Sequence, residues 1–322
     1  RVREILAEEL PDVTICISSE VCPEIREYER FSTTCANAYV RPLMSGYLYR
    51  LADLLKAKNL DCPLFLMMSG GGLTTLDHAA RYPIRLVESG PAGGAILAAD
   101  VALECGIDEV LSFDMGGTTS KICLIENGQP ERSRSFEVAR MYRDLKGSGM
   151  PVRIPVIEMV EIGAGGGSIA RVDDMGRITV GPDSAGSEPG PACYGLGGDN
   201  ATVTDANLAL GKLDPDRFAG GKITLSADKS QAVLDRDVGD KLSLKDHWSA
   251  AGIAEIVEEN MANAARVHAI ERGKVINRHT MIAFGGGAPL HAGRLAQKLG
   301  IATVIVPKGA GVGSAIGFLR AP

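Results

Sequence analysis

The segment 113–120, Phe-Asp-Met-Gly-Gly-Thr-Thr-Ser, holds the residues whose types and spacing best suit phosphate chemistry. They are a carboxylate, two glycines and two hydroxyls: Asp114, Gly116, Gly117, Thr118 and Thr119. Glycine lets the backbone approach an anion closely, and the N–H groups and hydroxyls can donate hydrogen bonds to it. The aspartate stands where a carboxylate could hold a metal-bound water. An ordinary β-hairpin with a Gly-Gly turn has the same pattern, so both interpretations are open at this point.

Apolar runs on both sides must position this turn. Residues 110–113 precede it, and residues 121–125 follow it. Apolar and β-branched residues around two glycines predict a strand, a tight turn and a second strand, with the glycines tolerating positive φ.

Similar glycine-rich loops recur along the chain. They lie at residues 69–72, 88–94, 163–167 and 285–287. Two of them precede stretches predicted to be helical, at residues 95–104 and 292–299. A strand, a glycine loop and a helix N-terminus together present free backbone N–H groups to an anion. The alternative is that the glycines only allow close packing of helices on a sheet. The repetition predicts an α/β architecture with ligand loops at strand ends.

The clearest helix is predicted over residues 250–272, where Gly273 ends it. Its apolar side is predicted to contain Ile253, Ile256, Val257, Met261, Ala264, Val267 and Ile270. His268 lies near that side and is interpreted as a core histidine. The loop 181–200 has too many glycines and prolines for a regular element, and its Cys193 is predicted to be buried and inert.

Residues 126–157 have a different composition, with few apolar residues among basic ones. The basic residues are Arg132, Arg134, Arg140, Arg143, Lys146 and Arg153. This pattern predicts an exposed, irregular excursion. Directly after it, Glu158 and Glu161 lie three positions apart before the loop 163–167. Within one strand they would face opposite sides, so a shared metal site would need a bend between them.

Composition excludes several classes of protein. A net charge of −6 and 5% aromatic residues disfavour a nucleic-acid partner. No apolar run approaches the roughly 20 residues that span a bilayer, so no membrane partner is expected. The 7 cysteines form no C-x-x-C pair, which indicates reduced thiols and a cytoplasmic protein. The chain has no G-x-x-x-x-G-K-[ST] motif and no well-formed G-x-G-x-x-G motif, which disfavours a dinucleotide enzyme.

Several motifs resemble those of a known family. Asp114-Met-Gly-Gly-Thr-Thr-Ser is similar to the second phosphate motif of the actin, sugar kinase and heat-shock ATPase superfamily, and Ala283-Phe-Gly-Gly-Gly-Ala-Pro-Leu-His291 to its adenosine motif. Five further segments resemble the hydantoinase A, 5-oxoprolinase and acetone carboxylase β-subunit family: Glu88-Ser-Gly-Pro-Ala-Gly-Gly94, Ile162-Gly-Ala-Gly-Gly-Gly-Ser-Ile-Ala170, Gly181-Pro-Asp-Ser-Ala-Gly186, Pro189-Gly-Pro-Ala-Cys-Tyr-Gly195 and Thr202-Val-Thr-Asp-Ala-Asn207.

This resemblance implies an α/β fold of the actin-like ATPase (ribonuclease H-like) type, with mixed sheets flanked by helices. It implies that residues 1–105 are the remainder of a first lobe with connecting helices. Residues 106–322 would form the second lobe, with a glycine-rich insertion at 126–222 and a nucleoside loop at 281–292. The family's first phosphate hairpin is missing from the sequence, so we expect an incomplete N-terminal lobe and an isolated fragment without ATPase activity.

The implied activity is ATP-dependent phosphorylation of a cyclic amide or carbonyl substrate, as in hydantoin or 5-oxoproline ring opening. A ketone carboxylase β subunit and a non-catalytic assembly module are the alternatives. ATP and Mg²⁺ are the implied cofactors, with Asp114 as catalytic residue and metal-water ligand. The phosphate clamp would be Gly116, Gly117, Thr118 and Thr119, and the nucleoside loop Gly285, Gly286 and Gly287. The implied partner is a hydantoinase B-like or carboxylase α-like subunit, and a homodimer is left open.

The chain departs from the family pattern at two motifs. Lys121 stands where many relatives carry aspartate at the end of the phosphate motif. Many hydantoinase A members carry Asp-x-His before the glycine loop, whereas this chain has Glu158 and Val160 at those positions. A metal site that depends on this histidine is therefore not expected, and Glu161 cannot be assumed to replace it.

Overall fold

The computed structural model describes residues 1–139, 141, 147–245 and 247–322. The chain folds into two compact units. The first unit contains residues 1–97, 130–158 and 314–322, and the second contains residues 98–129 and 159–313. The predicted division into lobes at residue 105 stays a prediction, because a compact unit is defined by its internal packing and a lobe by its relation to a superfamily.

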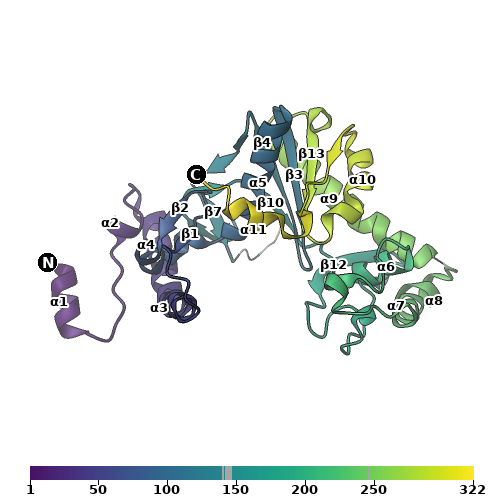
Figure 1. Cartoon of the computed structure of the whole chain (residues 1–322), viewed down its shortest axis with the longest axis horizontal. Helices are drawn as coiled ribbons and strands as arrows, with labels where there is room; N and C mark the ends of the chain where they lie inside the picture. Colours follow the sequence, from purple (N-terminus) through teal and green to yellow (C-terminus); the bar gives the residue numbers. More distant parts are fainter. Residues whose placement is uncertain (140, 142–146, 246) are drawn as a thin grey trace. The chain divides into compact units, whose positions relative to one another are not determined.

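A mixed sheet forms the centre of the second unit, with the strand order β10-β4-β3-β13-β14. β4 (Ser120–Glu126) runs antiparallel to both β3 (Glu109–Met115) and β10 (Val160–Ile162), whereas β13 (Thr280–Phe284) runs parallel to β3 and to β14 (Val304–Ile305). Figure 1 shows β4, β3 and β13 side by side with helices α9 and α10 next to them. The predicted α/β class, with a mixed sheet flanked by helices, is confirmed, and this strand order is that of the ribonuclease H-like fold.

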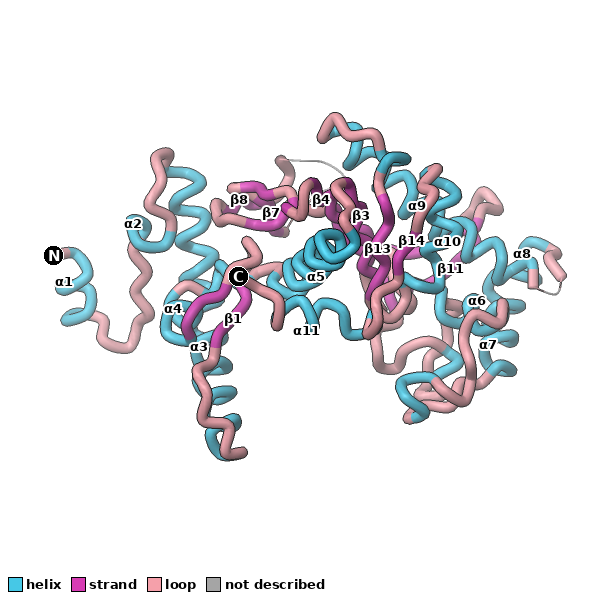
Figure 2. Tube along the Cα trace, turned by 45° about the horizontal axis from the view of Figure 1, so that its top comes forward, coloured by secondary structure: helices cyan, strands magenta, loops and turns pink. Residues whose placement is uncertain are grey.

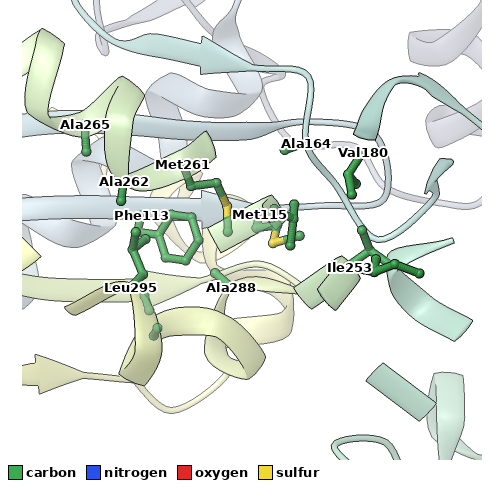
Figure 3. Close-up of a cluster of buried hydrophobic side chains, with 14 of the residues drawn as sticks. Phe113, Met115, Ala164, Val180, Ile253, Met261, Ala262, Ala265, Ala288 and Leu295 are labelled. Atoms are coloured by element: carbon green, nitrogen blue, oxygen red, sulfur yellow. The ribbon is translucent and has the colours of Figure 1, made fainter. Parts of the chain in front are cut away.

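The central strands are apolar almost throughout because both of their faces are buried. Leu111, Phe113 and Met115 of β3 are fully buried, and so are Met281 and Ala283 of β13. Figure 3 shows Phe113 and Met115 packed with side chains of α9 and α10. This core fixes the end of β3, from which the turn with the candidate site begins.

Helices α9 and α10 pack against the sheet of the second unit. α9 (Trp248–Glu271) contacts β4 and β10, and α10 (Ala288–Leu299) contacts β3, β13 and α9. The other elements of this unit are β11 (Ser168–Val172), β12 (Ile178–Ser184), η2 (Ala192–Tyr194), α6 (Val203–Ala209), η3 (Phe218–Gly221), α7 (Ala227–Leu234), the π-helix η4 (Asp235–Gly239), α8 (Asp240–Leu242), η5 (Ile276–Arg278) and η6 (Ala310–Val312).

The first unit is built on a long helix, α3 (Glu27–Ala57), with short hairpins. Figure 2 shows α3 as the longest helical segment of this unit. Its other elements are α1 (Val2–Glu9), α2 (Ser18–Val21), β1 (Phe65–Met67), β2 (Leu73–Thr75), α4 (Leu76–Arg81), η1 (Pro83–Leu86), β6 (Arg132–Ser133), β7 (Phe136–Val138), β8 (Met150–Val152), β9 (Val156–Ile157) and α11 (Gly313–Phe318). α5 (Ser89–Cys105) begins in this unit and ends in the second, and β5 (Gln129–Pro130) lies at the second boundary between the units.

The sequence predicted a glycine loop at residues 88–94 that precedes a helix, and the structure corrects this prediction. α5 begins at Ser89, so these glycines lie in its first turns. A Cβ on Gly93 would lie 2.6 Å from the carbonyl oxygen of Ser314, and a Cβ on Gly317 would lie 1.7 Å from that of Gly93. The glycines therefore permit α5 and α11 to cross at backbone contact, which is the packing interpretation.

Three other local predictions need correction. The described residues between 126 and 157 form short strands, with Val152 and Val156 buried, instead of the predicted irregular excursion, and Arg140, Arg143 and Lys146 lie outside the described residues. β12 continues through the predicted loop as far as Ser184. Ile253, Val257 and Met261 of α9 are buried as predicted, but Val267 and Ile270 are 56% and 75% exposed. The buried side of α9 instead continues through the small residues Ala265 and Ala269 and includes His268, the predicted core histidine.

Among the described residues, none of the helices is both long and apolar enough to cross a membrane.

Candidate functional site

The turn between β3 and β4 has the predicted hairpin geometry. Met115 faces Ser120 across the two strands, and the N–H of Gly116 donates to the carbonyl oxygen of Thr119 at 3.1 Å. Gly116, Gly117 and Thr118 are exposed, whereas Thr119 and Asp114 are half-buried. The turn therefore presents two glycines and a hydroxyl at the surface of a rigid strand pair.

Neither glycine of this turn adopts positive φ, which corrects the expected reason for their presence. Within the described part of the chain, apart from each glycine and its two chain neighbours, no atom lies within 4 Å of the position that a Cβ would take at Gly116 or Gly117. Backbone conformation and packing thus leave room for a side chain at both positions. Glycine at both positions is instead consistent with close approach of a ligand to the backbone, and backbone N–H groups in such a turn can bind an anion.

The second predicted loop, residues 285–287, lies at the same sheet edge as the turn. β3 and β13 are parallel neighbours, so both end at this edge, and Phe284 is the register partner of Asp114. The N–H of Gly287 donates to the carbonyl oxygen of Met115 at 2.8 Å. Gly285 has φ of +90°, and a Cβ there would lie 2.4 Å from Oδ1 of Asp114. The structure therefore brings the predicted phosphate and nucleoside residues together, with glycine required at Gly285.

A third loop, residues 163–167, supports the turn from the side of β10. The N–H groups of Gly166 and Gly167 donate to the carbonyl oxygens of Gly116 and Gly117, at 3.0 and 2.6 Å. A Cβ on Gly165 would lie 2.6 Å from backbone atoms of Thr118. These contacts fix both carbonyl groups of the turn, so its shape does not depend on a ligand.

Helix α6 in turn supports this third loop. The carbonyl oxygen of Gly166 accepts from both the N–H and the hydroxyl of Thr204, at 2.7 and 2.8 Å. Thr202 caps α6, and the carboxylate of Asp205 accepts from both the N–H and the hydroxyl of Thr202. The same buried carboxylate accepts from the N–H of Cys193 at 2.8 Å and from the hydroxyl of Ser230 at 2.9 Å. The buried carboxylate of Asp205 thus has a structural role.

Lys121 directs its ammonium group to the turn. Its Nζ donates to Oγ1 of Thr119 at 3.0 Å and to Oε1 of Glu161 at 2.8 Å. Glu161 lies in β10, whereas Glu158 lies outside that strand and its N–H donates to the carbonyl oxygen of Glu131. Among the described residues, no group of three or more His, Cys, Asp or Glu side chains could hold a metal ion. Lys121, which departs from the family pattern, thus forms an ion pair with Glu161.

A buried polar network that the sequence analysis missed lies behind the nucleoside loop. Nδ1 of His291, in the first turn of α10, lies 2.9 Å from Oε1 of Glu258 in α9, and its Nε2 lies 3.0 Å from the amide nitrogen of Asn207 in α6. Lys212 donates to the same Glu258 oxygen at 3.4 Å. His291 and Asn207 end two of the family-like segments, and that polar ending is the signal that could have found the network. The network joins the helix of the nucleoside loop to the helix that supports the third loop.

The residues at this sheet edge fit a nucleotide with its metal ion. Open backbone at Gly116, Gly117 and Gly286 leaves space for phosphate and nucleoside groups. Mg²⁺ is commonly held by one or two carboxylates together with substrate phosphates and water, and Asp114 can supply one carboxylate. A nucleotide-binding site is therefore chemically consistent with this geometry.

Residues 30–322 match the family model described as hydantoinase/oxoprolinase. The chain is 38% identical over 308 residues to caprolactamase subunit alpha of Pseudomonas jessenii, and this match covers 96% of this chain and 43% of that protein. It is 31% identical over 331 residues to 5-oxoprolinase of Saccharomyces cerevisiae, and this match covers 98% of this chain and 24% of that protein. A nucleotide-free structure of acetone carboxylase, from work on the mechanism of ATP-dependent acetone carboxylation, matches with a TM-score of 0.83 and 27% identity over 98% of this chain and 43% of that chain. The chain spans less than half the length of each of these relatives.

Proposed function

Since this chain belongs to the hydantoinase/oxoprolinase family, as its motifs predicted, we propose that it forms the ATP-binding part of an enzyme that phosphorylates an amide or carbonyl oxygen. The observation that carries the proposal is the convergence of two glycine loops at one sheet edge. Phe284 and Asp114 are register partners, and Gly287 is bonded to Met115. Loops at the ends of neighbouring parallel strands are a common place for a ligand in α/β proteins.

In this proposal, the chain's own residues act by positioning and charge stabilisation. Bound ATP supplies the phosphoryl group, and Mg²⁺ neutralises phosphate charge. The N–H groups and hydroxyls of the turn hold phosphate oxygens, with Gly117, Thr118 and Thr119 as donors. Asp114 would hold Mg²⁺ as a metal-water ligand, and residues 285–287 would hold the nucleoside. Phosphorylation converts a poorly reactive amide or carbonyl group into an activated one.

Ring opening of a cyclic amide, of the hydantoin or 5-oxoproline kind, is the activity that we propose first. The names of the caprolactamase and 5-oxoprolinase relatives support this substrate class. ATP-dependent carboxylation of a ketone is the second candidate, because the acetone carboxylase structure matches almost the whole chain. ATP turnover stimulated by a cyclic amide alone supports the first, whereas a requirement for both ketone and bicarbonate supports the second.

We further propose that a partner subunit completes the reaction, of the hydantoinase B-like or carboxylase α-like kind. The relative from Pseudomonas jessenii is itself named as a subunit. A clamp of this superfamily uses two phosphate hairpins, and this sequence carries one of them. We therefore expect the chain by itself to turn over no ATP.

The test of the proposed function is Asp114→Ala in an enzyme that also carries the first phosphate hairpin and is assembled with its partner subunit, called the assembled enzyme below. We expect ATP turnover to fall on the order of 100-fold, because positioned groups that stabilise developing charge contribute about this much. Asp108→Ala is the matched control, since Asp108 is an exposed carboxylate just before the opposite end of β3. Unchanged ATP turnover in the Asp114 variant would remove this site from the mechanism.

A further inference from the structure

Three charged residues lie in one row across the strands that carry the candidate site. Lys121 of β4 is the register partner of Asp114 in β3 and of Glu161 in β10. Side chains of directly opposed residues in antiparallel strands share one face of the sheet. Lys121, two residues after Thr119, therefore places a cation between the carboxylates of Asp114 and Glu161.

The contacts of Lys121 point its charge at the turn. Its side chain is only 17% exposed, and its Nζ contacts both Oγ1 of Thr119 and the carboxylate of Glu161, whose side chain is 48% exposed. An ammonium group has donors and no acceptor, so Oγ1 of Thr119 must accept this hydrogen bond. The hydroxyl proton of Thr119 must then point away from Lys121, which leaves it as a donor for another group.

We propose that Lys121 is a positioning residue that sets the Thr119 hydroxyl as a hydrogen-bond donor to a nucleotide phosphate, with Glu161 holding the ammonium in place. This inference rests on the proposed function, because it assigns a role within the same phosphate turn. Lys121 itself acts through Thr119. It gives a specific purpose to a lysine at a position where many relatives carry aspartate.

The test is a double-mutant cycle in the assembled enzyme, with Mg²⁺–ATP as the probe in calorimetric titration and turnover. Lys121→Met and Thr119→Val are each expected to weaken ATP affinity or turnover roughly tenfold, the usual scale for one hydrogen bond that involves a charged group. The double variant is expected to lose no more than Thr119→Val alone, because Lys121 acts through that hydroxyl. Multiplying losses would show instead that Lys121 acts independently and would overturn the inference.

Two further variants keep the test informative if Lys121→Met folds poorly, which its melting temperature would show. Glu161→Gln retains the shape of the side chain and is expected to weaken ATP binding by a smaller factor. Lys274→Met removes the cation paired with Glu126 at the other end of β4, and it should leave ATP binding unchanged. A wild-type assembled enzyme that binds no ATP would overturn the proposed function and this inference with it. Lys121 and Glu161 variants that bind ATP like the Lys274 control would overturn the inference alone.

Discussion

The turn at Gly116 and Gly117 and the loop at Gly165 to Gly167 are both glycine-rich and lie against each other, but glycine is present in them for different reasons. In the turn, a Cβ would meet no described atom within 4 Å. In the loop, a Cβ on Gly165 would lie 2.6 Å from backbone atoms of Thr118, and one on Gly167 would lie 3.0 Å from the carbonyl oxygen of Gly117. The loop glycines are therefore required by the fold, whereas the turn glycines are available for a ligand.

This difference separates two layers of the candidate site. The outer layer is the turn itself, in which Gly116, Gly117 and Thr118 are exposed, and the inner layer is a close-packed support that fixes the carbonyl groups of the turn. A substitution in the inner layer should first change stability, and a substitution in the outer layer should first change binding.

The largest effect is expected from Gly165→Ala. Backbone atoms of Gly117 and Thr118 cannot yield as a flexible side chain would, so overpacking should lower the free energy of unfolding by about 3 kcal/mol. Urea unfolding followed by circular dichroism measures this loss. Gly117→Ala is the matched control, because its φ is not positive and its Cβ would meet no described atom, so its stability should change by less than about 0.5 kcal/mol. Equal stability losses in both variants would break the comparison.

The next largest loss of stability is expected from Asp205→Asn, which weakens the support that α6 gives to the loop 163–167. In Asp205→Asn, one acceptor oxygen becomes an NH₂ group that faces N–H and hydroxyl donors of Thr202, Cys193 or Ser230. The free energy of unfolding should fall by about 2 kcal/mol, the cost of leaving buried donors without an acceptor. The same urea titration measures it. Asp183→Asn, which alters an exposed pair with Arg171, should change stability by less than about 1 kcal/mol. If the two variants lost the same small amount, the carboxylate of Asp205 would have no supporting role.

Gly117→Ala is the sharpest test of the outer layer. Its expected effect on the free energy of Mg²⁺–ATP binding is smaller than the two stability losses above. The methyl group would occupy the space in which a phosphate should approach the backbone, so affinity should fall at least tenfold, or about 1.4 kcal/mol. Titration calorimetry of the assembled enzyme measures the change. Gly46→Ala in α3 is the binding control, because its φ is not positive and its Cβ would meet only the flexible end of the Arg50 side chain. Unchanged affinity at position 117 would mean that the turn does not hold phosphate.

Much of this arrangement could be predicted from the sequence, because the signals are local. The apolar runs around Gly116 and Gly117 predicted β3, β4 and their turn. The parallel pairing that brings Phe284 beside Asp114 follows from tertiary packing and was not predicted. Likewise, whether a glycine is needed for packing or leaves open space depends on residues distant in sequence, as Gly165 against Thr118 shows. The role of Lys121 was missed for the same reason, since its partner Glu161 lies on a separate strand.

The last prediction uses cysteine chemistry to report on the inner layer without altering it. Cys193 is fully buried beside Asp205, and burial raises the pKa of its thiol, so at neutral pH it has little of the thiolate that reacts with iodoacetamide. Cys62 and Cys105 are exposed and should be alkylated quickly in the folded protein, whereas Cys193 should remain unmodified until the support layer opens. Peptide mass spectrometry over a time course measures all three sites. In Asp205→Asn the Cys193 reaction should accelerate while Cys62 and Cys105 keep their rates. Fast labelling of Cys193 in the wild-type protein would show that the layer beneath the turn is open, and the two glycine segments would then differ less than their geometry indicates.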